Sequence, residues 1–230
     1  MSEPGSRRGR VHNAEGAREA ILNAAEEAFA EQGFDGARID AIAARAGYNK
    51  SLIFQYFGDK LSLYVEVMKR ADQEMSKLQE NVFTHLHADE TIVSDVRKFR
   101  AFLESIVGML FDFLEQHPRL IRIFLWEQAD GWQTYQKIFE QLLPDEIEPW
   151  ERFFDIARKN GLLHSDFSPT IQLTTALQIC LSHLAGLPLY KMVQPDMDLY
   201  SAEGKARSRT YIINLIVAGI LVDTSDDSFT

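Results

Sequence analysis

Apolar residues recur at helical spacing along most of the chain, with charged residues between them. In residues 14–32 the apolar positions share one helical face: Ala17, Ile21, Ala24, Ala25, Ala28 and Phe29. This pattern predicts an amphipathic helix that Gly33 ends. Shorter helical patterns follow at residues 38–46 and 50–57, with Gly47 and Gly58 as C-terminal stops. Asn49 and Asp59 are good N-caps for the third and fourth helices.

Longer helical patterns occupy the rest of the chain, at residues 92–116, 119–127, 132–143, 146–160, 168–192 and 202–222. Strand-like alternation bounded by turn signals is absent, so we expect an all-α protein of about nine helices. The predicted organisation is a three-helix head at residues 13–60 and a larger helical body at 61–224. Residues 1–12 are expected to form a disordered basic arm, and residues 225–230 a disordered tail.

Charge is distributed unevenly along the 230 residues, whose formal net charge is -10. Residues 1–70 hold ten Lys or Arg and ten Asp or Glu, so the whole negative excess lies beyond them. A neutral head can still present one positive face. No apolar run is long enough to span a bilayer, and the N-terminus lacks the apolar core of a signal peptide. The single Cys180 fits a reducing compartment, so we expect a cytoplasmic protein without membrane association.

The segment GYNKSLIFQYF at residues 47–57 combines aromatic residues with polar ones. Two short helices joined by a tight turn with glycine form a helix-turn-helix unit. On the second helix Ile53 and Phe57 are four apart and share the inner face, whereas Lys50, Phe54 and Gln55 lie opposite. A mixed cationic, hydrogen-bonding and aromatic surface suits the major groove of DNA. The alternative is an ordinary helical hairpin whose aromatics belong to the core.

Residues 17–68 resemble the DNA-binding domain of TetR-family transcriptional regulators. The resemblance rests on the end of the first helix at residues 24–34 and on four later segments: Ile39-Asp40-Ala41-Ile42-Ala43 with Ala46-Gly47, Tyr48-Asn49-Lys50-Ser51, Ile53-Phe54-Gln55-Tyr56-Phe57, and Gly58-Asp59-Lys60 with Leu63. Three positions depart from the pattern of the family. Phe54 replaces the usual tyrosine, Leu52 replaces a frequent threonine, and the second helix begins with Ala37-Arg38 in place of a hydroxyl residue.

The resemblance implies a role for each residue of the head. Base edges or sugars would face the start of the third helix, and phosphates would face its later residues and the start of the fourth helix. The resulting DNA-binding candidates are Arg38, Arg45, Asn49, Lys50, Ser51, Leu52, Phe54, Gln55, Tyr56 and Lys60. The arginines of the N-terminal arm, Arg7, Arg8 and Arg10, would enter a minor groove or bind nothing.

For the body, the resemblance implies a homodimer and a pocket for a small-molecule effector. Dimerisation would use the helices at about residues 168–192 and 202–222, and two recognition helices would read a palindromic operator in double-stranded DNA. A pocket needs apolar walls and a few polar anchors. The candidates are Phe102, Phe111, Phe124, Trp126, Trp132, Tyr135, Phe154, Gln178 and His183, with plain core packing as the alternative for each.

No catalytic constellation, cofactor motif or metal site is recognisable, so we do not expect an enzyme. The pair His85 and His87 is interpreted as part of a solvated loop between helices rather than as a metal site. The predicted function is a DNA-binding transcriptional regulator, a repressor released from its operator by an effector. Two alternatives remain: a helical small-molecule-binding protein whose head no longer reads DNA, and a helical enzyme.

Overall fold

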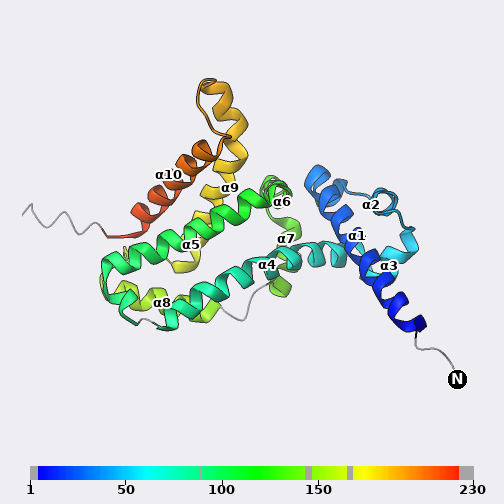
Figure 1. Ribbon diagram of the computed structural model, residues 1–230, viewed down its shortest axis with the longest axis horizontal. Helices are drawn as coiled ribbons and strands as arrows, with labels where there is room; N and C mark the ends of the chain where they lie inside the picture. Colours follow the sequence, from blue (N-terminus) through cyan, green and yellow to red (C-terminus); the bar gives the residue numbers. More distant parts are fainter. Residues whose placement is uncertain (1–4, 89, 143–146, 165–167, 223–230) are drawn as a thin grey trace, which may run out of the picture. The chain divides into compact units, whose positions relative to one another are not determined.

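The structure is a computed structural model that describes residues 5–88, 90–142, 147–164 and 168–222; the side chains of residues 5–13, 78–88, 90 and 147–149 lie outside that description. In the described part, ten α-helices and one 3-10 helix follow one another, and no named strand occurs (Figure 1). The all-α prediction is confirmed, with ten helices rather than about nine. No described helix is long and apolar enough to cross a membrane.

The helices have the following bounds: α1 Gly5–Gly36, α2 Ile39–Ala46, α3 Lys50–Phe57, α4 Lys60–Ala88, α5 Val96–Gln116, α6 Pro118–Ala129, α7 Gln133–Leu142, α8 Ile147–Lys159, α9 Pro169–Val193 and α10 Ala202–Ile220. The 3-10 helix η1 covers Glu90–Ser94. Helix α9 contains Pro188. The predicted tail at residues 225–230 lies outside the described residues.

Three boundaries differ from the sequence prediction. Helix α1 already begins at Gly5, where a disordered arm was expected, because a helix extends readily once its first turn is formed. Helix α4 includes the positions of His85 and His87, which were expected in a loop. Helix α5 begins at Val96, four residues after the predicted start at residue 92. The carboxylate of Asp95 accepts the N–H of Arg97 at 2.8 Å and caps the helix there.

Two compact units divide the chain, and the boundary between them falls within α4. Unit 1 comprises residues 1–74 and 118–143, and unit 2 comprises residues 75–117 and 144–230. This division differs from the linear boundary at residue 60 that the sequence suggested. The difference arises because α6, from the expected body, packs along α1 in unit 1.

The core of unit 1 holds the helix-turn-helix in place. Four of its helices, α1 to α4, contribute the fully buried side chains of Ile21, Phe29, Ile42, Ile53, Leu63 and Tyr64. The ring centroid of Phe29 lies 4.9 Å from that of Tyr64 in an edge-to-face contact. Helical periodicity predicts a core made of Ile21, Phe29, Ile39, Ile42, Tyr48, Ile53 and Phe57. All are buried except Ile39 and Tyr48, which are half-buried.

Unit 2 is built around α5, which packs against α9 and α10. The guanidinium of Arg209 on α10 donates to both carboxylate oxygens of Asp112 on α5, at 2.6 and 2.9 Å. A Cβ at Gly108 would collide with the Nη2 of Arg209, so a larger residue there would require the guanidinium to shift. At the other end of α10, an isolated antiparallel bridge joins Leu221 to Leu163.

Candidate nucleic-acid interface

The turn between α2 and α3 is fixed by local hydrogen bonds. Gly47 has φ +76°, a left-handed conformation that favours glycine. The N–H of Tyr48 donates to the carbonyl of Ala43 at 3.0 Å, which ends α2. The side-chain oxygen of Asn49 accepts the N–H of Leu52 at 2.8 Å and starts α3. The predicted stop at Gly47 therefore sets the end of α2, and the predicted cap at Asn49 sets the start of α3.

Helix α3 divides into two faces as its periodicity predicts. Ile53 is fully buried and Phe57 is 7% exposed, so these two side chains anchor the helix to the core. The outward residues are exposed: Lys50, Ser51, Phe54 and Gln55. Leu52 and Tyr56 are half-buried at the edges of this face. The outward face combines an ammonium group, a hydroxyl, an amide and an aromatic ring, which are groups that can meet phosphates and base edges.

Asp40 of α2 lies beside the cation of the outward face. The Nζ of Lys50 is 3.1 Å from the Oδ1 of Asp40 and 5.9 Å from the centre of the Phe54 ring. Lys50 was a predicted DNA-binding residue, whereas its contact with Asp40 was not predicted. The two residues are ten positions apart on different helices, so their contact depends on the crossing of α2 and α3.

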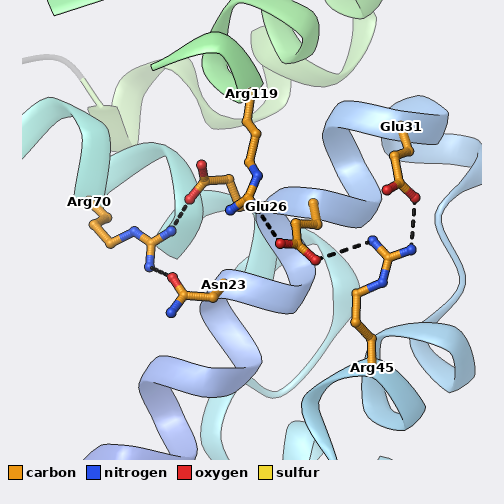
Figure 2. Close-up of polar contacts among 7 residues, drawn as sticks. Asn23, Glu26, Glu31, Arg45, Arg70 and Arg119 are labelled. Atoms are coloured by element: carbon orange, nitrogen blue, oxygen red, sulfur yellow. Dashed lines mark hydrogen bonds and ion pairs between the residues drawn. The ribbon is translucent and has the colours of Figure 1, made fainter. Parts of the chain in front are cut away.

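Arg45 is oriented by two carboxylates of α1 (Figure 2). Its Nη2 donates to the Oε2 of Glu31 at 2.8 Å, and its Nη1 lies 3.7 Å from the Oε2 of Glu27. This hydrogen bond raises the pKa of Arg45 and lowers the pKa of Glu31. Arg38, at the N-cap of α2, is exposed, makes no side-chain cap and forms no ion pair with a described residue.

The carboxylates of α1 are shared with two other helices of unit 1. Arg119 of α6 pairs with Glu27, and Arg70 of α4 pairs with Glu26 and donates to Asn23 at 2.7 Å (Figure 2). Glu27 therefore lies between a cation of α6 and a cation of the helix-turn-helix. The Arg119, Glu27 and Arg45 side chains are 33–46% exposed, so each pair contributes about 1 kcal/mol or less to stability. Their main effect is to orient Arg45.

Lys60, expected at a phosphate, points back toward the end of α1. Its Nζ donates to the carbonyl oxygen of Asp35 at 3.2 Å and lies 4.6 Å from the centre of the Phe34 ring. Burial lowers the pKa of Lys60. At the same helix start the carboxylate of Asp59 accepts the N–H of Ser62 at 2.7 Å, as its predicted cap role requires. A DNA phosphate at the start of α4 would therefore compete with the carboxylate of Asp59 for the backbone N–H groups of the first turn.

The effector candidates are divided between the two units. In unit 1, the rings of Phe124, Trp132 and Tyr135 are 5.6–6.2 Å apart, while Trp126 lies against Gly33. In unit 2, Phe102 and Phe154 flank Trp150, with centroids 6.4 and 5.9 Å from that ring.

The remaining candidates in unit 2 lie on α5 and α9. The Phe111 ring is 6.1 Å from that of His183, whose buried Nε2 has no hydrogen-bond partner among the described residues. Burial lowers the pKa of His183, so the imidazole is neutral near pH 7. Gln178 is half-buried on α9. The buried positions Phe102, Phe111 and Phe154 are core residues of unit 2.

Comparison with known proteins supports the nucleic-acid interpretation of this interface. Residues 21–67 match the family model for bacterial regulatory proteins of the tetR family. The transcriptional repressor BepR of Brucella suis biovar 1 is 37% identical over 175 residues, which are 74% of this chain and 77% of the relative. The transcriptional repressor SCO4008 of Streptomyces coelicolor is 32% identical over 107 residues, about half of each protein (46% and 47%).

The likeness also extends to the fold outside the matched domain. The solved structure of SCO4942 from Streptomyces coelicolor superimposes with a TM-score of 0.60, covering 89% of this chain and 98% of that one at 22% identity. Three observations point to the same family. They are the capped helix-turn-helix, the match to the family model, and a relative of which three quarters of the length is matched. The chain therefore belongs to the TetR family of bacterial transcriptional regulators.

Proposed function

We propose that the protein is a sequence-specific repressor that binds a palindromic operator in the cytoplasm as a homodimer and leaves it when a small molecule binds. The observation that carries the proposal is the outward face of α3. Lys50, Ser51 and Gln55 are exposed on a helix whose inner face and N-terminus are both fixed. Such a preorganised helix can enter a major groove without losing core contacts.

The first experiment is selection of bound duplexes from a random pool at two salt concentrations. An inverted repeat with half-sites one DNA turn apart, about 34–36 Å, is the expected product. Affinity for it should fall steeply with salt, since phosphate contacts release counterions. The protein could be folded and dimeric and still select no sequence at either salt concentration. In that case the alternative, a small-molecule-binding protein whose head no longer reads DNA, replaces the proposal.

Phe54 gives that alternative its specific support. A tyrosine hydroxyl at this position would donate to a phosphate, and the phenylalanine ring, 42% exposed, cannot. Lys50 and Gln55 nevertheless keep polar groups on the same face. We therefore place the DNA contacts on Lys50, Ser51 and Gln55, with Phe54 packing on sugar or thymine methyl groups.

The surfaces of α9 and α10 support homodimerisation. Ile212, Ile216 and Val217 bury one face of α10, yet Tyr211 and Leu215 on another face are 62% and 50% exposed. On α9, Leu189, Met192 and Val193 are 55–73% exposed. A helix that is apolar on more than one face is normally covered on each of them. A second copy of the chain, packing through the same two helices, would cover these side chains.

Replacing Leu215 with glutamate should convert the dimer to a monomer. A charge introduced into an apolar interface has no partner and opposes association. Because Leu215 is half exposed in the single chain, the fold should be retained. Analytical ultracentrifugation measures the mass, and Thr210→Glu, an exposed position on the same helix, is the matched control. A variant that remains dimeric would place the interface elsewhere.

A further inference from the structure

A cavity of about 300 Å³ lies within unit 1, between the end of α1 and the helices α6 and α7. Its walls include Gly33 and Asp35 of the α1 end, Trp126, Glu127 and Asp130 of the α6 end, and Thr134 of α7. This volume is at the lower end of the range for small-molecule sites. The sequence did not predict a cavity here, although Trp126 was among the candidates for an effector pocket.

Glu127 is the most informative residue of the cavity wall because it is a buried acid, only 4% exposed. Its Oε1 accepts the hydroxyl of Tyr64 at 2.6 Å, and its Oε2 accepts the N–H of Tyr135 at 2.9 Å. Burial raises the pKa of Tyr64, so the phenol remains a donor. No Lys, Arg or His among the described residues forms an ion pair with this carboxyl group.

Thr134 supplies a second polar group to the cavity wall. The residue is 4% exposed. A threonine hydroxyl can both donate and accept a hydrogen bond. A ligand in the cavity can bond to this hydroxyl and place a positive charge beside Glu127.

The rim adds negative charge and an aromatic surface. Asp35 and Asp130 are exposed at the mouth, and the Nζ of Lys60 donates to the backbone oxygen of Asp35. The indole of Trp126, 46% exposed, is held by a hydrogen bond from its Nε1 to the carbonyl of Ala30 at 3.3 Å. An aromatic face near carboxylates attracts cations.

The walls select an organic cation over a metal ion. Among the described residues, no three His, Cys, Asp or Glu side chains are grouped as metal ligands. An ammonium or amidinium group can donate to Glu127 and Thr134, and its carbon body can lie against Trp126. We propose that this cavity binds a small organic cation, a protonated amine or amidine, through Glu127 and Thr134.

Occupancy of the cavity would act on the end of α1. Residues 33–36 form one wall and lead directly into α2, and Lys60 lies on the Phe34 ring at the same place. A bound cation would therefore restrain the segment that precedes the helix-turn-helix. This regulatory consequence rests on the proposed function, whereas the binding itself does not.

The test uses benzamidinium, a planar cation, and benzamide, its neutral counterpart, with DNA-free protein in isothermal titration calorimetry. We expect saturable binding of benzamidinium to the wild type and none of benzamide. Glu127→Gln should weaken binding about tenfold or more, because a hydrogen bond to a charged group is lost. Glu140→Gln, an exposed acid of α7 outside the cavity, is the matched control and should bind like the wild type.

Thr134→Val keeps the experiment decisive if Glu127→Gln disturbs folding. The substitution replaces the hydroxyl with a methyl group and keeps the branched side chain, so this variant should fold normally and bind benzamidinium several-fold more weakly. Equal binding of benzamide, absence of saturable binding by the wild type, or unchanged affinity in folded Thr134→Val protein would each overturn the proposal. Because DNA is absent, such a failure leaves the operator experiment unaffected.

Discussion

Lys50→Glu is expected to lower the affinity for the selected operator by about 2–4 kcal/mol, or roughly 30- to 700-fold. The substitution removes one charge-assisted contact and places a carboxylate opposite the phosphates. The slope of log affinity against log salt concentration should also become shallower by about one. Fluorescence anisotropy of a labelled operator duplex, repeated at several salt concentrations, measures both quantities.

Asp40→Asn should change the affinity in the opposite direction. Asp40 holds the Nζ of Lys50 at 3.1 Å, so it competes with phosphate for the same cation. Neutralising it releases Lys50 and removes a negative charge from the DNA-facing surface, which should raise the affinity several-fold. The Asp40→Asn variant should keep its fold, because the side chain of Asp40 is exposed. If both variants bind like the wild type, the outward face of α3 is not the DNA-binding surface.

The contrast between caps and ion pairs explains which parts of this interface the sequence could predict. Asn49 and Asp59 each bond an amide three residues away, so local sequence contains the information that defines α3 and the start of α4. The burial of Ile53 and Phe57 follows from helical periodicity in the same way. These features need no knowledge of how helices cross.

Contacts between residues far apart in the sequence were not predictable, because they depend on the angles at which the helices cross. Glu31 and Arg45 are fourteen residues apart, and Tyr64 and Glu127 are sixty-three apart. Lys60 was assigned to a phosphate from its position alone, while the fold places Phe34 and Asp35 beside it. The cavity at Glu127 was missed for the same reason, since its walls come from the end of α1 and from α6 and α7. In the sequence, the hint of this cavity was an acidic residue, Glu127, at the end of the apolar helical pattern of residues 119–127.

Phe29→Ala should lower the free energy of unfolding of unit 1 by about 3–5 kcal/mol. Phe29 is fully buried and packs edge-to-face against Tyr64, so the truncation removes apolar burial and leaves a cavity under the helix-turn-helix. Domains of this size are stable by about 5–15 kcal/mol, so the loss is a large part of the total. Urea unfolding followed by circular dichroism measures the change.

Phe54→Ala is the matched control, since it removes the same side chain from a position that is 42% exposed. Its free energy of unfolding should stay within about 0.5 kcal/mol of the wild type, as for most surface substitutions. The two variants together separate stability from recognition. Phe54→Ala should weaken operator binding without loss of stability, whereas Phe29→Ala should weaken binding only in proportion to the fraction unfolded. Equal destabilisation by both substitutions would mean that Phe54 is a core residue and that α3 presents a different face to DNA.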